Sequence, residues 1–158
     1  MKKRSCFGLW TVVWLLAAVG VIVFFVVAPW TAVFARQLFP AYRMFFWPGL
    51  AYTWVVAALY ALALFDFARI VRNIVRDRSF CLENARRLRS ISILALADTL
   101  LCAAVMLALL FLHALHPGLF LLLLLISAVG AGITIASAAL SHLTVKAAQM
   151  QDENDLTI

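Results

Sequence analysis

The sequence has few charged residues and few residues that interrupt helices. Only 13% of its 158 residues are charged, and it contains 6 glycines and 4 prolines. Soluble domains carry about 25% charged residues, so this composition excludes an ordinary soluble fold. The scarcity of glycine and proline excludes collagen-like and low-complexity chains. Hydrophobic residues make up 66% of the sequence, which predicts an integral membrane protein that mostly contacts lipid.

Cysteine is also scarce, and the sequence lacks the usual signatures of enzymes. Cys6, Cys81 and Cys102 show neither metal-ligand spacing nor a disulfide pattern. There is no Ser-His-Asp set, no H-E-x-x-H motif and no glycine-rich phosphate loop. His113 and His116 lie close together, which is too weak a pattern to indicate a metal or haem site. We therefore expect a non-enzymatic protein without a cofactor or metal.

Four long apolar runs predict four membrane-spanning helices. A helix rises 1.5 Å per residue, so about 20 apolar residues cross a bilayer core of about 30 Å. The runs are too long and continuous for the strands of a membrane barrel. They are residues 7–28, 49–68, 91–115 and 118–145. The chain 1–158 is thus predicted to be a single all-α domain, an integral membrane bundle of four transmembrane helices.

The connections between these runs differ in length. Pro29 is expected to end the first helix, and the aromatic-rich residues 28–49 are expected to lie along the membrane interface. Residues 113–118 predict a tight turn, because Pro117 suits the first position of a helix. The basic N-terminus and the Val33–Ala35 sequence are also typical of a signal peptide, which leaves cleavage as an alternative. The first apolar run is longer than a signal core, so we expect it to remain as a span.

Lysine and arginine are distributed unevenly between the predicted connections. Of the 13 basic residues, all but Arg36 and Arg43 lie at the N-terminus, in the loop 69–90 or in the tail 146–158. Lysine and arginine accumulate in cytoplasmic loops. This asymmetry predicts that both termini and the loop 69–90 are cytoplasmic.

The loop 69–90 is expected to be largely helical. Arginines recur at helical spacing from Arg69 to Arg76, so the second helix is expected to continue past the membrane. Residues 79–80 break the pattern, and a new helix is expected from Leu82.

Two local ion pairs are expected near this loop. Glu83 stands four residues before Arg87, the favourable order for a helical ion pair. Asp66 stands three residues before Arg69, so a local pair is expected there as well.

The arginines of the loop 69–90 have two readings that the sequence leaves open. They can reach anionic lipid headgroups and fix the orientation of the chain, each contributing about 1 kcal/mol. They can equally form a docking surface for a cytoplasmic protein. Direct binding of nucleic acid is not expected, because no aromatic pattern or known module accompanies them. The candidate contact residues are Arg76, Arg78, Phe80, Glu83, Asn84, Arg86, Arg87 and Arg89.

The C-terminal tail is acidic and is expected on the same side as these arginines. Its charge comes from Asp152, Glu153 and Asp155. Opposite charges at one end of a small bundle attract, although exposed pairs contribute only about 0–1 kcal/mol each. We therefore expect the tail to fold back toward the loop 69–90.

Asp98 is an acidic residue deep inside a predicted span. An ionisable group within a membrane is costly and is often functional. Hydrogen-bond donors at similar depth on the other spans are Trp14, Tyr60, Thr134 and Ser137. One interpretation is an interhelical hydrogen bond made by a protonated Asp98. The alternative is a small proton- or ion-coupled transporter or channel subunit centred on this carboxyl group.

The fourth run carries small and hydroxylated residues at 3-4-3-4 spacing. They are Ser127, Gly130, Thr134, Ser137 and Ser141. Such residues let membrane helices approach closely and form hydrogen bonds across the contact. We expect this face to pack against the third or the first span.

Two motifs give the chain a family resemblance. The segment F-C-L-E-N-A-R-R-L-R-S-I, residues 80–91, resembles the F-[ST]-x-E-N-x-x-R-L-R-x-I signature of a bacterial four-helix membrane family, the domain-of-unknown-function family 2975. The ending E-N-D-L-T-I, residues 153–158, is similar to the C-terminus of that family, and the order of spans agrees. Cys81 stands where the family has a helix-capping serine or threonine. Capping by Cys81 is therefore in doubt, with Ser79 as a substitute.

The resemblance implies a location and a class of partner, although the family has no established activity. Its members are often encoded beside a small helix-turn-helix regulator. This implies a regulatory protein of the bacterial inner membrane that binds a cytoplasmic DNA-binding protein. The matching positions are Phe80, Glu83, Asn84, Arg87, Leu88, Asp155, Leu156 and Thr157. A further alternative, besides transport, is a lipid-binding structural subunit. A homo-oligomer is compatible with each of these functions.

Overall fold

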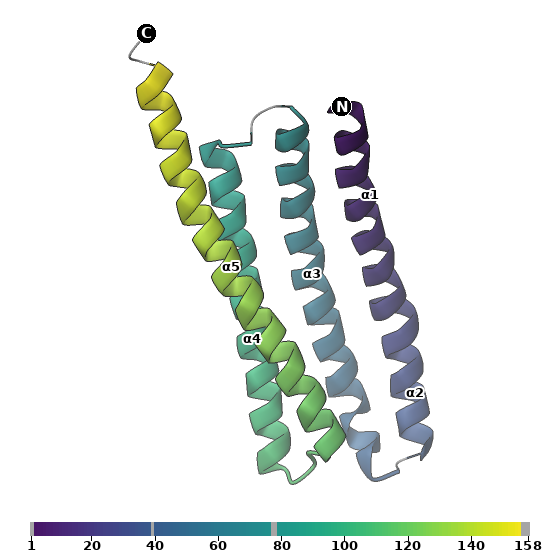
Figure 1. Ribbon diagram of the computed structural model, residues 1–158. Helices are drawn as coiled ribbons and strands as arrows, with labels where there is room; N and C mark the ends of the chain where they lie inside the picture. Colours follow the sequence, from purple (N-terminus) through teal and green to yellow (C-terminus); the bar gives the residue numbers. More distant parts are fainter. Residues whose placement is uncertain (1, 39, 77–78, 156–158) are drawn as a thin grey trace. The chain divides into compact units, whose positions relative to one another are not determined.

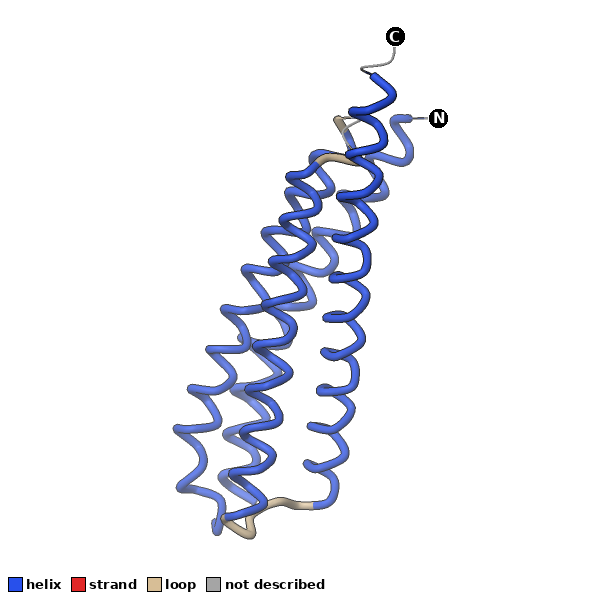
Figure 2. Tube along the Cα trace, turned by 90° about the vertical axis from the view of Figure 1, so that its left-hand side faces the viewer, coloured by secondary structure: helices blue, strands red, loops and turns tan. Residues whose placement is uncertain are grey.

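The computed structural model describes residues 2–38, 40–76 and 79–155, and nearly all of them are helical (Figures 1 and 2). Within these ranges there is no strand. The elements are α1 (Lys2–Val21), a π-helical segment (Ile22–Val27), α2 (Ala28–Leu38), a 3-10 segment (Pro40–Phe45), α3 (Phe46–Val75), α4 (Leu82–Phe111) and α5 (Pro117–Asp155).

Among the described residues, four helical stretches are long and apolar enough to cross a membrane. They are Gly8–Gln37, Arg43–Val75, Leu82–Phe111 and Pro117–Gln151. A helix satisfies its backbone hydrogen bonds internally, as a lipid environment requires. The predicted all-α class with four spans is confirmed, and the chain is a multi-pass membrane protein. The helices are longer than the predicted apolar runs, because polar residues extend the helices at their ends.

The prediction that Pro29 ends the first helix is wrong. The backbone N–H of Ala28 donates to the carbonyl of Val23, five residues back, which is π-helical hydrogen bonding. This wider turn makes room for the Pro29 ring, which would otherwise clash with the carbonyl four residues earlier. The chain therefore continues as α2, and much of the segment expected along the membrane interface extends the first helix instead.

The chain forms two compact units, Met1–Leu64 and Phe65–Ile158, and α3 contributes to both. In the first unit, aromatic residues connect α3 to the π-helical segment. The rings of Phe24 and Tyr60 lie 5.6 Å apart, and Phe25 meets Trp54 edge-on at 5.6 Å. The Tyr60 hydroxyl donates a hydrogen bond of 2.8 Å to the carbonyl oxygen of Leu16, so this contact also satisfies the polar end of the ring.

In the second unit, α4 and α5 pack side by side in antiparallel directions. The Ser141 hydroxyl donates to the Ala85 carbonyl oxygen at 2.7 Å, near the start of α4. Further along, the Ser92 hydroxyl donates to the Thr134 carbonyl oxygen at 2.9 Å. Hydroxyl groups thus reach the backbone of the neighbouring helix, and the predicted packing role of the small and hydroxylated face of α5 is confirmed.

Gly130 lies where α5 closely approaches α4. A Cβ atom added at Gly130 would overlap the Thr99 hydroxyl oxygen, whereas one added at Gly132 would meet nothing within 4 Å. Glycine at position 130 therefore permits the approach of the two helices, and Gly132 lies away from it.

The turn between α4 and α5 places its histidines in structural roles. His113 adopts a left-handed backbone conformation with φ of 52°. The backbone N–H of Gly118 donates to His116 Nδ1 at 3.2 Å, so His116 caps the start of α5. The tight turn predicted at residues 113–118 is confirmed, and α5 begins at Pro117.

Replacing Gly130 by alanine should destabilise the α4–α5 pair by about 1–3 kcal/mol, the usual cost of overpacking. Gly132→Ala is the matched control, because it adds the same methyl group to the same helix without a clash. The free energy of unfolding of both variants can be measured in detergent micelles. Adding Thr99→Ala, which removes the obstructing hydroxyl, should restore much of the stability lost in Gly130→Ala. Equal stability of the two glycine variants would contradict the assignment.

Candidate functional site at the turn between helices α3 and α4

The turn between α3 and α4 is short. Helix α3 ends at Val75 and α4 begins at Leu82, which confirms the predicted break at residues 79–80. Cys81 is the N-cap residue of α4, with an extended backbone and no side-chain capping bond. The expected doubt about Cys81 is therefore justified, since its thiol does not replace the hydroxyl of a capping serine or threonine.

Asn84 ties this turn to both helices. It is 2% exposed, and its Oδ1 accepts a hydrogen bond of 2.8 Å from Asn73 on α3. Its amide nitrogen donates to the carbonyl oxygen of Ser79 at 3.0 Å. An unpaired buried polar group costs about 1–3 kcal/mol, so both bonds favour this one arrangement. Asn84, expected as a partner contact, is occupied inside the protein.

Arg87 forms the charged part of the same structure. Its Nη1 lies 2.9 Å from Asp66 Oδ1 on α3, and its Nη2 lies 2.9 Å from Glu83 Oε1. Arg87 and Asp66 are mostly buried, with side chains 18% and 15% exposed, whereas Glu83 is 56% exposed. The predicted Glu83–Arg87 pair is confirmed. The Asp66 bond is the more shielded of the two, and it joins α3 to α4.

The predicted local pair between Asp66 and Arg69 is wrong. The Arg69 guanidinium instead lies over the Phe65 ring, with 4.6 Å between its central carbon and the ring centroid. Cation–π contacts of this kind stabilise an arginine whose carboxylate neighbour is engaged elsewhere. Arg87 reaches Asp66 because its long side chain crosses from the adjacent helix.

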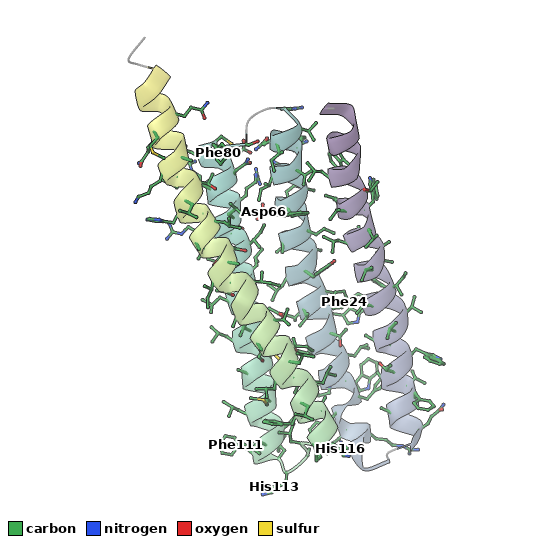
Figure 3. All side chains as sticks on the ribbon, viewed as in Figure 1. Phe24, Asp66, Phe80, Phe111, His113 and His116 are labelled. Atoms are coloured by element: carbon green, nitrogen blue, oxygen red, sulfur yellow. The ribbon has the colours of Figure 1, made fainter. Side chains whose placement is uncertain are left out.

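The remaining arginines of this end point outward. Arg72, Arg76, Arg86 and Arg89 are exposed, and within the described ranges none of them makes an ion pair. Phe80 is 61% exposed at the turn (Figure 3). Arg78 lies outside the described residues. The candidate residues therefore separate into an inward pair, Asn84 and Arg87, and an outward set, with the exposed Glu83 bonded to Arg87.

The acidic tail continues α5 rather than folding back. Helix α5 extends without a break to Asp155 and runs past the start of α4 (Figure 1). The expectation of a tail folded toward the loop is therefore wrong for the residues up to Asp155. Leu156 and Thr157 lie outside the described residues. The tail and the α3–α4 turn still lie at the same end of the second unit.

Asp98 does not make the expected interhelical hydrogen bond. Its Oδ1 is buried and, among the described residues, has no hydrogen-bond partner. The hydroxyl of Thr134 donates to Gly130 of its own helix, and the hydroxyl of Tyr60 is engaged with Leu16. Trp14 is 71% exposed. Thr134, a donor of the same unit, therefore does not satisfy Asp98.

Ser137 and Ser127 complete the account of the polar groups on α5. Ser137 is buried. The Ser127 hydroxyl is buried without a hydrogen-bond partner in the described part of the chain. Among the described residues of the second unit, three buried polar atoms thus remain without a hydrogen-bond partner: Asp98 Oδ1, the Ser127 hydroxyl oxygen and Arg69 Nε.

The sequence analysis missed two features of this polar structure: the role of Asn73, and the pairing of Asp66 with Arg87. Both pairs, Asn73–Asn84 and Asp66–Arg87, connect the two helices that flank the turn. The spacing in the sequence could have indicated these pairs. Asp66 and Asn73 are seven residues apart and therefore share one face of α3. Asn84 and Arg87 share one face of α4 in the same way.

The described residues contain no group of three or more His, Cys, Asp or Glu side chains that could hold a metal ion. The described residues at the turn instead offer a surface with exposed arginines and an exposed aromatic ring.

Comparison with known proteins gives one match. The sequence model of a family described as "Protein of unknown function (DUF2975)" matches residues 30–158, which confirms the resemblance found in the two motifs. No curated protein and no solved structure matches the chain.

Proposed function

The chain belongs to the DUF2975 family, and from this premise we propose that it is a non-enzymatic, regulatory membrane protein that binds a cytoplasmic protein. The contact surface is the α3–α4 turn together with the acidic end of α5. Both termini and the turn lie in the cytoplasm of a bacterial cell. The bias of lysine and arginine toward these segments supports this orientation.

One observation carries the proposal: Phe80 is 61% exposed at a turn whose backbone is held by the buried Asn84. Arg76, the residue after the end of α3, is also exposed, four residues before Phe80 in the sequence. Aromatic residues and arginine are enriched at protein interfaces, and they supply most of the binding energy there. Asn84 holds the Ser79 carbonyl beside Phe80 in place, and a contact that is held in place before binding loses little conformational entropy when a partner docks.

The chemistry of this surface suits an acidic patch on the partner. Within the described residues the outward arginines make no ion pair, and complementary charge on a partner increases the rate of association. A small helix-turn-helix regulator, which the family resemblance implies, would be held at the membrane and away from DNA.

The test is affinity purification of the tagged full chain from its native membranes after crosslinking in cells. The double variant Arg76→Gln/Phe80→Ala should lose a soluble partner that the unchanged chain retains. Phe111→Ala is the matched control, because Phe111 is 79% exposed at the opposite end of α4 (Figure 3). The proposal fails if every soluble protein recovered with the unchanged chain is recovered equally with the turn variant.

A second candidate function is proton- or ion-coupled transport centred on Asp98. It is favoured by the buried Asp98 oxygen that has no partner within the described residues, because an unpaired ionisable group inside a span is a recurrent feature of proton pathways. Vesicles containing the purified chain and a pH-sensitive dye should then acidify under an imposed potential. Asp98→Asn should abolish this flux, while flux no faster than that of protein-free vesicles would reject transport of protons.

A further inference from the structure

One face of α4 combines arginines at one end with apolar side chains along its length. Arg86 and Arg89 lie on this face, three residues apart, and both are exposed. The same helical spacing continues through exposed apolar side chains. These are Ile93, Leu96, Leu100 and Leu107. The face, called here the α4 lipid face, therefore changes from charged to apolar where the long apolar run of α4 begins.

A groove lies between α4 and α5 at the charged end of this face. Its volume is about 170 Å³, and it is lined by Leu82, Ala85, Arg86, Arg89, Ser141 and Val145. The Ser141 hydroxyl is already engaged by the Ala85 carbonyl oxygen. The two guanidinium groups are therefore the unneutralised polar groups of the groove. Neither makes an ion pair within the described ranges.

We propose that this groove binds the phosphodiester headgroup of an anionic membrane phospholipid, with an acyl chain lying along the α4 lipid face. Guanidinium groups bind phosphate oxygens through paired hydrogen bonds. The leucine-rich part of the face offers an acyl chain a continuous apolar contact. A phospholipid has this same order of an anionic head followed by an apolar chain.

Two other occupants fit this surface less well. A soluble phosphate would use the guanidinium groups and leave the apolar part of the face without a ligand. An acidic protein segment would have to enter the membrane to cover Ile93 and Leu96. The groove is also separate from the proposed protein-binding surface, which uses Arg76 and Phe80, so either proposal can fail without the other.

The test measures thermal unfolding of the purified full chain in a neutral maltoside detergent with added lipid. Dioleoylphosphatidylglycerol should raise Tm more than dioleoylphosphatidylcholine, which has the same acyl chains and no net charge. The double variant Arg86→Gln/Arg89→Gln should lose most of this difference. The control Arg72→Gln/Arg76→Gln removes the same charge from exposed arginines at the same end of the unit, and it should keep the difference.

Three results would overturn the proposal. The first is an equal loss in the two double variants, which would indicate attraction by net charge alone. The second is a Tm increase with inorganic phosphate that matches the increase with phosphatidylglycerol, which would indicate a soluble anion. The third is no difference between the two lipids for the unchanged chain.

Discussion

The ion pair between Arg87 and Asp66 is the interaction on which the rest of this site depends. It joins α3 to α4 at 2.9 Å in a mostly buried position, and the Asn73–Asn84 hydrogen bond supports it closer to the turn. Removing one partner from a shielded pair leaves a charge without compensation, which costs more than the pair itself contributes. Arg87 and Asn84 are directed inward, whereas Phe80 is exposed. The exposed arginines of this end are Arg72, Arg76, Arg86 and Arg89.

The membrane environment explains why α4 and α5 of the second unit are joined by hydrogen bonds. Lipid tails are as apolar as leucine, so helices associate through close packing and hydrogen bonds rather than through exclusion of water. Ser92 and Ser141 donate to carbonyl groups of the neighbouring helix, and Gly130 lets the backbones approach. Many leucines of α4 and α5 are exposed, as expected of helices whose outer faces contact lipid.

The sequence predicted what depends on local pattern and missed what depends on the placement of helices. Long apolar runs gave the four spans, and the spacing of Glu83 and Arg87 gave their ion pair, because both features lie within one helix. The partner of Asp66 lies 21 residues away on the next helix, where only tertiary structure identifies it. The prediction that Pro29 ends the first helix failed because a π-helical turn accommodates the proline, and no residue type specifies such a turn. The donors expected near Asp98 were chosen by their depth in the membrane, and depth alone does not give the rotational position of a side chain on its helix. Thr134 shows the consequence, because its hydroxyl bonds to its own helix.

A double-mutant cycle on Asp66 and Arg87 tests the central claim most directly. Unfolding free energies in detergent micelles would be compared for Asp66→Asn, Arg87→Gln and the double variant, beside a second cycle that pairs Glu83→Gln with Arg87→Gln. The account predicts a coupling energy of about 1–3 kcal/mol for Asp66 with Arg87, and less than about 1 kcal/mol for the exposed Glu83 with Arg87. A coupling energy near zero for Asp66 with Arg87, or a larger one for Glu83, would contradict it.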